Sequence, residues 1–273
     1  MRYKIDIEYD GTNYSGWQKQ GQGLSIQEII EDSVAKLSGQ NTEVVGCGRT
    51  DAGVHAISQV AHFDLNKKIA KATIVSGLNY YLGLYNRLLI SKFGEAITDK
   101  FGNFYSNFKL LNGQDIVVKS CEIVNEDFHA RFSSKMRHYQ YIIINRPTPL
   151  VLMKNRAWHV IKELNVDLMN RASRTLIGKH DFSSFRDSQC QALSPVKTMS
   201  GCEVIRKDDE IIFKFSAKSF LHHMIRNIVG TLKDVGTGKT SVDEFQKILE
   251  AKDRKMAGMN APACGLYFLG AEY

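Results

Sequence analysis

The chain has 273 residues, 43% of them hydrophobic and 10% aromatic, a composition that excludes a disordered or fibrous protein. Its length allows one large domain or two of about 130 residues each. The 36 lysines and arginines outnumber the 29 acidic residues, which gives a net charge of +7 and a pI near 9.0. This modest excess favours a polyanionic partner such as RNA, although many small proteins are mildly basic without one.

The cysteine pattern and the N-terminal residues favour a cytoplasmic protein. The five cysteines are odd in number and form no C-x-x-C pair, which disfavours a disulfide framework and a structural zinc site. The first residues alternate between charged and apolar side chains and lack the apolar run of a signal peptide. No run of about 18 apolar residues is present, so we expect no membrane span.

The first part of the sequence predicts a strand, a helix and two further strands. Residues 3–9 alternate between apolar and charged side chains, as in a strand with one buried face. Ser25 and Glu28 have the spacing of a capping box for a helix, which Gly39 is placed to end. The two further strands are predicted at 42–48 and 58–65.

The later part of the sequence predicts a comparable series of elements. These are a strand at Met136–Asn145, a helix from about Asp167 to Ile177, a hairpin from Glu203 to Lys218, an amphipathic helix within 219–236, a helix capped by Ser241 and Glu244, and a closing strand at 265–273. Residues 67–112 are rich in Tyr, Phe, Asn and Lys and lack a clean period, so they receive no assignment.

Two parts with a similar order of elements predict an α+β fold. We expect two similar α/β subdomains with mostly antiparallel or mixed sheets and helices on one face. The division is placed between residues 1–125 and 126–273. The sequence contains no dinucleotide-binding glycine fingerprint and no Walker loop.

The segment CGRTDAGVHA, from Cys47 to Ala56, contains the first candidate for chemistry. Asp51 lies there between glycines, two residues after Arg49. Asp-x-Gly is also an ordinary turn, because Asp can bond its own backbone and Gly tolerates positive φ. The local pattern therefore leaves both a turn residue and a catalytic acid open.

Two other candidates carry an ordinary structural alternative as well. Arg226 lies at the edge of the apolar stripe of the helix predicted within 219–236, where it could extend into water or pair with a carboxylate in a cleft. Tyr139 lies in a basic strand, where it could stack on a base or pack in the core.

The histidines do not show metal-ligand spacing. His222 and His223 are adjacent on the same predicted helix, and adjacent helical side chains point about 100° apart, so we expect that the two do not bind one metal. The sequence has no G-x-S-x-G motif, so it does not indicate a serine hydrolase. It has no second acid near Asp51, so it does not indicate the paired carboxylates of a glycosidase.

Six segments together resemble the TruA-type tRNA pseudouridine synthases, in that family's order and across nearly the whole chain. They are EYDGTNYSGWQ (8–18), GRTDAGVHA (48–56), DFHARFSSKMRHYQYII (127–143), GKHDFSSF (178–185), FLHHMIRNIVG (220–230) and GLYFLG (265–270). The resemblance implies isomerisation of uridine to pseudouridine at positions 38, 39 and 40 in the anticodon stem-loop of tRNA. It also implies no cofactor, no metal, and a homodimer of two-domain subunits with the active site in the cleft between the domains.

The resemblance also assigns roles to four residues. Asp51 matches the family's catalytic aspartate, Tyr139 its substrate-contacting tyrosine, and Arg226 the arginine that pairs with the aspartate. Arg49 is expected to contact the RNA and to help extrude the target base. The carboxylate could attack C1′ or C6, or remove a proton from C2′, and the sequence does not choose among these routes.

In one place the chain departs from the family. An insertion at about 83–111 separates segments that the family joins closely, and its part in tRNA docking or dimerisation is open.

Two other classes of function remain possible. One rival function is RNA binding without catalysis, for which an acid among phosphates is unfavourable. The other is a metal-dependent nuclease or phosphatase, which would need more acids than Asp51, the only one between Gly46 and His62.

Overall fold

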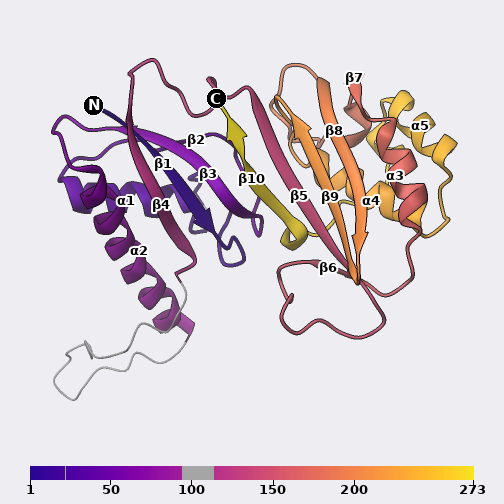
Figure 1. Ribbon diagram of the computed structural model, residues 1–273, viewed down its shortest axis with the longest axis horizontal. Helices are drawn as coiled ribbons and strands as arrows, with labels where there is room; N and C mark the ends of the chain where they lie inside the picture. Colours follow the sequence, from indigo (N-terminus) through magenta and orange to yellow (C-terminus); the bar gives the residue numbers. More distant parts are fainter. Residues whose placement is uncertain (22, 94–113) are drawn as a thin grey trace.

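The computed structural model describes residues 1–21, 23–93 and 114–273. Within these residues ten strands form one sheet, accompanied by five α-helices (Figure 1). The strands are β1 Arg2–Tyr9, β2 Val45–Gly46, β3 His55–Asp64, β4 Ile116–Val124, β5 Met136–Asn145, β6 Trp158–Val160, β7 Gly178–Asp181, β8 Val196–Lys207, β9 Glu210–Ala217 and β10 Leu266–Glu272. The helices are α1 Ile26–Ser38, α2 Lys71–Phe93, α3 Val166–Arg174, α4 Met224–Gly236 and α5 Val242–Ala251.

The sheet is continuous through both parts of the chain. Its order is β4-β1-β3-β10-β5-β9-β8-β7, with β2 paired to β3 and β6 paired to β5. Strand β10 makes the central junction, because Tyr267 lies opposite His55 in a parallel pair and Phe268 lies opposite Tyr139 in an antiparallel pair. The mixed, mostly antiparallel α/β class is confirmed. The two subdomains divided near residue 125, and helices on a single face, stay predictions.

The helices form two groups at the two ends of the sheet (Figure 1). Helix α1 packs on α2, which contacts β4, whereas α3 contacts β8, α4 and α5. Helix α1 starts after Ser25 as expected, because the Ser25 hydroxyl accepts from the backbone N–H of Glu28 at 3.2 Å; the reciprocal bond of the expected capping box is not formed between these two described residues. It ends at Gly39, whose φ of 73° is left-handed. At α5 both bonds of the capping box join Ser241 and Glu244.

Helix α2 lies in the segment that the sequence left unassigned. Its buried residues Ile74, Leu78 and Leu82 recur every four positions, as on one face of a helix. Tyr80 is largely exposed, so aromatic residues on the outer side hide the helical period. Of the insertion expected at about 83–111, residues 83–93 belong to this helix and the rest lie outside the described residues.

The cysteines and the hydropathy of the helices can be compared with the expectations from the sequence. All five cysteines lie in the described residues, and none of them forms a disulfide. No helix in the described part of the chain has both the length and the hydropathy needed to cross a membrane.

Candidate active site

Asp51 lies in a tight turn between β2 and β3, and backbone hydrogen bonds stabilise this turn. The backbone N–H of Val54 donates to the Asp51 carbonyl at 3.2 Å, and Gly53 adopts the positive φ of 78° that this turn requires. The Trp17 N–H donates to the Thr50 carbonyl at 3.0 Å. The glycine-rich loop after β1 therefore supports the backbone that presents the Asp51 carboxylate.

Three basic side chains converge on the Asp51 carboxylate. Arg226 Nη1 lies 2.9 Å from Oδ2, and its Nε donates to the Ala261 carbonyl at 2.7 Å, which fixes the guanidinium. His223 Nε2 lies 3.2 Å from Oδ2, and His222 Nε2 lies 3.3 Å from Oδ1. Both carboxylate oxygens therefore face positive or hydrogen-bonding groups.

This arrangement keeps the Asp51 carboxylate charged. Burial alone would raise the pKa of Asp51, but the hydrogen bond from His222 and the charges of His223 and Arg226 outweigh it, so the pKa lies below the ordinary value. The hydrogen bond to Asp51 raises the pKa of His222, against the effect of its burial. At neutral pH Asp51 is therefore an ionised acid in a largely desolvated setting.

The expectation that His222 and His223 diverge on a helix is wrong. Helix α4 starts only at Met224, and His223 precedes it with a left-handed φ of 60°. The two imidazoles stack with their centroids 3.9 Å apart, and both face Asp51. Asp187 holds them from the other side, with Oδ2 2.7 Å from His223 Nδ1.

The same residues bear on the expected absence of a metal. Ligand atoms of Asp51, His222 and His223 lie within 4.8 Å of one another, which is close enough to share one ion. Arg226 already places a cation on this carboxylate, and its charge opposes the binding of a dication. The absence of a metal therefore stays a prediction that needs an experiment.

A cavity of about 870 Å³ lies beside the Asp51 carboxylate. Residues from distant parts of the sequence line it, among them Arg49, Asp51, Arg131, Arg137, Tyr139, Phe220, His222, His223 and Arg226. Arg49 is exposed, and within the described residues it makes no hydrogen bond or ion pair. The cavity thus combines one ionised acid with a basic rim.

Tyr139 lines this cavity from β5 but is mostly covered. Only 8% of the residue is exposed, and the rings of Phe220 and Phe268 lie 5.1 and 4.9 Å from its own. Its hydroxyl lies close to Gly48, where a Cβ would sit 3.1 Å from that oxygen. Burial raises the pKa of Tyr139 far above its ordinary value, so the phenol is protonated at neutral pH.

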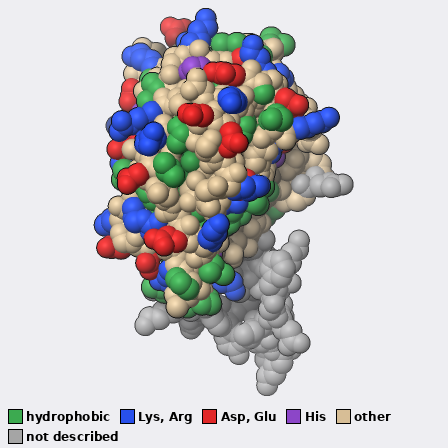
Figure 2. Space-filling model, turned by 90° about the vertical axis from the view of Figure 1, so that its right-hand side faces the viewer, with side chains coloured by type: hydrophobic (Ala, Val, Ile, Leu, Met, Phe, Trp, Pro, Cys, Tyr) green, Lys and Arg blue, Asp and Glu red, His purple; other side chains and the backbone are tan. Residues whose placement is uncertain are grey.

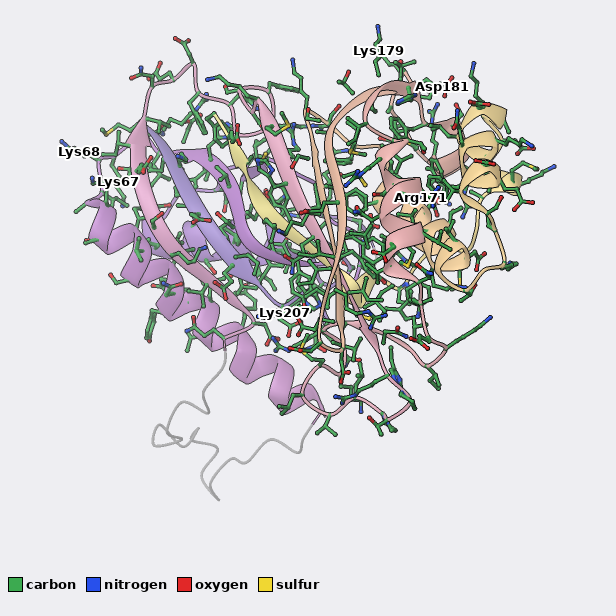
Figure 3. All side chains as sticks on the ribbon, turned by 45° about the vertical axis from the view of Figure 1, so that its right-hand side comes forward. Lys67, Lys68, Arg171, Lys179, Asp181 and Lys207 are labelled. Carbon is green, nitrogen blue, oxygen red and sulfur yellow. The ribbon has the colours of Figure 1, made fainter. Side chains whose placement is uncertain are left out.

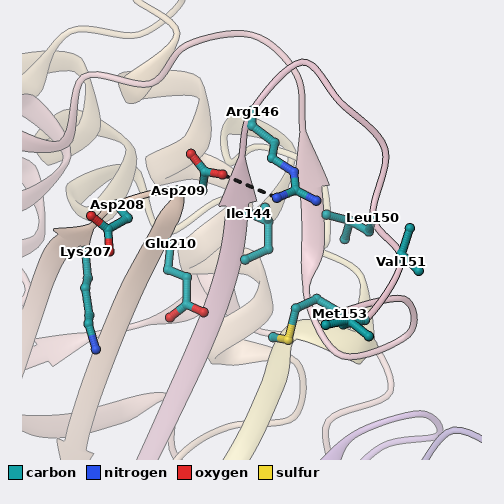
Figure 4. A pocket seen from close by; sticks show the side chains of 10 residues that line it. Ile144, Arg146, Leu150, Val151, Met153, Lys207, Asp208, Asp209 and Glu210 are labelled. Carbon is teal, nitrogen blue, oxygen red and sulfur yellow. Dashed lines mark hydrogen bonds and ion pairs between the residues drawn. The ribbon is translucent and has the colours of Figure 1, made fainter.

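A second cavity of about 580 Å³ lies at the other end of β5 (Figure 4). Its walls come from the segment after β5 and from the turn between β8 and β9, which carries Asp208, Asp209 and Glu210. Arg146 points across it and pairs with Asp209 at 3.4 Å. The three acids outnumber the two basic residues of its lining, Arg146 and Lys207, so this cavity has no positive excess to attract phosphates.

Comparison with known proteins identifies the family. A family model described as tRNA pseudouridine synthase matches residues 6–85 and 172–273, more than half of the chain. A protein named tRNA pseudouridine synthase A from Orientia tsutsugamushi (strain Ikeda) is 46% identical over 295 aligned residues, which cover all of both chains. The protein of the same name from strain Boryong is 46% identical over 285 residues, again with complete coverage of both. The chain belongs to the tRNA pseudouridine synthase family. It is therefore an enzyme, an isomerase that acts on tRNA.

The segments matched by the tRNA pseudouridine synthase model contain part of the candidate site. Asp51, Arg49 and Arg226 lie inside them, whereas Tyr139 lies in the intervening stretch that only the full-length relatives cover. Sequence reasoning did not assign roles to His222, His223, Asp187, Arg131 or Arg137. The LHHMIRN and MRHYQY stretches were the signals that could have pointed to three of these, His222, His223 and Arg137.

Proposed function

We propose that this tRNA pseudouridine synthase converts uridine to pseudouridine at positions 38, 39 and 40 of the anticodon stem-loop, with Asp51 as its essential residue. The observation that carries the proposal is the ionised Asp51 carboxylate, which three basic side chains hold beside the cavity. The match of the GRTDAGVHA segment to the family's catalytic motif supports the same assignment.

The reaction explains why a charged acid is needed. The C1′–N1 bond breaks, a C1′–C5 bond forms, and C5 loses its proton while N1 takes up a proton. A base stacked in a stem or loop must first be flipped into a pocket for this chemistry. Asp51 then attacks C1′ or C6, or removes a proton from C2′, and each route starts from the carboxylate. Arg226, His222 and His223 maintain that charge.

Two further residues receive substrate-binding roles. Tyr139 contacts the flipped base through its ring edge and hydroxyl, because Phe220 and Phe268 cover much of its ring. Its raised pKa argues against a resting phenolate that would remove the C5 proton. Arg49 is free on the cavity rim and contacts the RNA backbone, where it helps to extrude the base.

The wider assignments form part of the same proposal. We place the enzyme in the cytoplasm as a homodimer of two-subdomain subunits that works without cofactor or metal. The lining of the cavity by residues from both parts of the chain supports a site between the subdomains. The free cysteines agree with a reducing compartment.

The test uses tRNA transcripts that carry tritium at uridine C5, with release of tritium to water as the readout. We expect release by the wild type and by Asp209→Asn, a matched acid in the other cavity, with or without a chelator. Asp51→Ala and Asp51→Asn should lower the rate by about 10²-fold or more, because both remove the reacting carboxylate.

Other results would contradict the proposal in distinct ways. Tight binding of tRNA by the wild type without any tritium release would indicate an RNA-binding protein. Loss of activity on chelation, restored by a divalent metal, would indicate that the metal site at Asp51, His222 and His223 is used. Sequencing of the treated tRNA for pseudouridine would decide among positions 38, 39 and 40.

A further inference from the structure

Phe132, in the turn between β4 and β5, leaves most of its ring in water. The residue is 75% exposed, and among the phenylalanines whose side-chain burial the structure describes no other is largely exposed. Keeping such a ring in water is less favourable than burying it, so a ring that is both exposed and held in place is a candidate contact site.

The turn that carries Phe132 is held rigidly. His129 Nδ1 accepts from the backbone N–H groups of Arg131 and Phe132, each at 3.2 Å. The Ser133 N–H donates to the His129 carbonyl at 2.9 Å. The Ala130 N–H donates to His62 Nδ1 at 3.2 Å, which ties the turn to β3. The exposure of Phe132 is therefore not the result of a loose loop.

Two neighbouring side chains lie against the Phe132 ring. The ring of His129 lies 4.4 Å from that of Phe132, and the Arg131 guanidinium carbon lies 5.7 Å from the ring centroid. A positive charge beside a ring is attracted to its electron-rich face. Phe132 is thus fixed by protein groups, while the rest of its surface stays free for a ligand.

The turn is connected to the active-site cavity. Arg137, almost fully buried, donates through Nη2 to the Arg131 carbonyl at 2.5 Å and to the Cys47 carbonyl at 3.1 Å. Arg131 and Arg49 both line the cavity beside Asp51. A path of basic groups therefore leads from the reacting carboxylate to the exposed ring.

We propose that Phe132 is a stacking platform for an unpaired base of the bound tRNA, next to the flipped uridine, while Arg131 contacts the adjoining phosphate. The inference rests on the proposed function, because it takes tRNA as the ligand. Aromatic side chains beside basic groups are a general means of holding single-stranded RNA, since every base offers a flat face. The exposed Arg131 at this turn and the exposed Arg49 on the cavity rim favour RNA over a second protein chain as the occupant.

The test compares Phe132→Ala, Phe132→Leu and Phe132→Trp in the full-length enzyme. Stacking predicts that Ala and Leu raise the KM for tRNA about tenfold with a smaller effect on kcat, and that Trp retains the wild-type KM. Binding of tRNA should quench the fluorescence of the Phe132→Trp enzyme more than that of the wild type. Leu152→Ala, a similarly exposed residue at the opposite end of β5, is the matched control and should leave KM unchanged.

Two results overturn the inference. One is a KM for Phe132→Ala or Phe132→Leu within twofold of the wild type. The other is conversion of a wild-type dimer to a monomer by Phe132→Ala in sedimentation, which would mean that the ring packs on a second copy of the chain. Binding of tRNA is measured separately by filter retention. If the wild type binds tRNA without forming pseudouridine, that result contradicts the proposed function, whereas the contact between Phe132 and a base is still tested by the binding of the variants.

Discussion

At the scale of the residue, the proposed chemistry centres on the Asp51 carboxylate and its three basic neighbours. Burial of Asp51 favours its protonated form, and Arg226, His222 and His223 reverse that preference. The partners therefore keep the pKa of Asp51 below its ordinary value despite the burial of the carboxyl group. Removal of any one partner should be visible as a change in the pH dependence of the enzyme.

Replacement of Arg226 by Met should raise the pKa of Asp51, because burial is then opposed by the histidines alone. The acidic limb of the kcat/KM profile should move to higher pH, and activity at neutral pH should fall about tenfold or more. Arg226→Lys, which retains the charge, should move the limb less. Profiles measured between about pH 4 and pH 9 with an unchanged acidic limb in Arg226→Met would contradict this account.

The raised pKa of His222 predicts a pH-dependent contribution to stability. The folded protein holds the His222 proton more tightly than the unfolded chain does, so this stabilisation is present below the ordinary histidine pKa and is lost as pH rises through the raised value. The wild type should therefore exceed Asp51→Asn in free energy of unfolding by more at about pH 5.5 than at about pH 8.5. Urea denaturation at both pH values measures the difference, with Asp209→Asn as the control.

At the scale of the element, the N-terminus of α1 links stability to the site. Its residues Ile26 and Gln27 donate to the carbonyls of Gly16 and Trp17, and that loop in turn supports the backbone of Thr50. The cap at Ser25 thus holds both a helix end and the loop beneath Asp51.

Ser25→Ala removes the side-chain acceptor for the Glu28 N–H, and we expect it to cost about 1 kcal/mol of stability. Ser76→Ala, on the exposed side of α2, should change the free energy of unfolding by less than about 0.5 kcal/mol. Denaturant titration of both variants gives the comparison. An equal loss of free energy of unfolding in Ser25→Ala and Ser76→Ala would mean that the hydrogen bond at the Ser25 cap does not stabilise the protein.

The same elements show what the sequence could and could not predict. Strand β5, the β8–β9 hairpin and the end of α1 at Gly39 were predictable, because period and turn residues act locally. Helix α2 was missed because tyrosines lie outside its buried stripe. The resemblance could point to Asp51 and Arg226, but no local pattern shows the left-handed His223 that turns both imidazoles toward Asp51.

The distribution of charge matters at the scale of the whole molecule. On the face that Figure 2 shows, basic and acidic side chains are interspersed. The exposed Lys67, Lys68, Arg171 and Lys179 are spread over distant edges of the structure (Figure 3). The net charge of +7 is therefore a weak guide to where tRNA binds. The arginines on the cavity rim are the better candidates for phosphate contacts.

The activity should fall as salt rises, because bound phosphates release counterions. Arg49→Gln should lower the slope of log kcat/KM against log salt by about one, as expected for one lost phosphate contact. Lys179→Gln, at the outer edge strand β7, should leave the slope as it is. The measurement is kcat/KM over a series of salt concentrations; equal slopes for wild type and Arg49→Gln would remove Arg49 from the RNA contact.

The central position of β10 has a consequence for how the enzyme is made. The His55 ring hydrogen-bonds to the carbonyl of Cys264, which lies 209 positions later in the sequence. Strands β3 and β5 are joined in the sheet only through β10, which lies between them. On the ribosome the segment with Asp51 emerges early, yet its sheet cannot close until residues 266–272 have been synthesised. We expect a nascent chain halted before that point to expose the edges of β3 and β5 that β10 would pair with, and so to be prone to chaperone binding and aggregation rather than partly active.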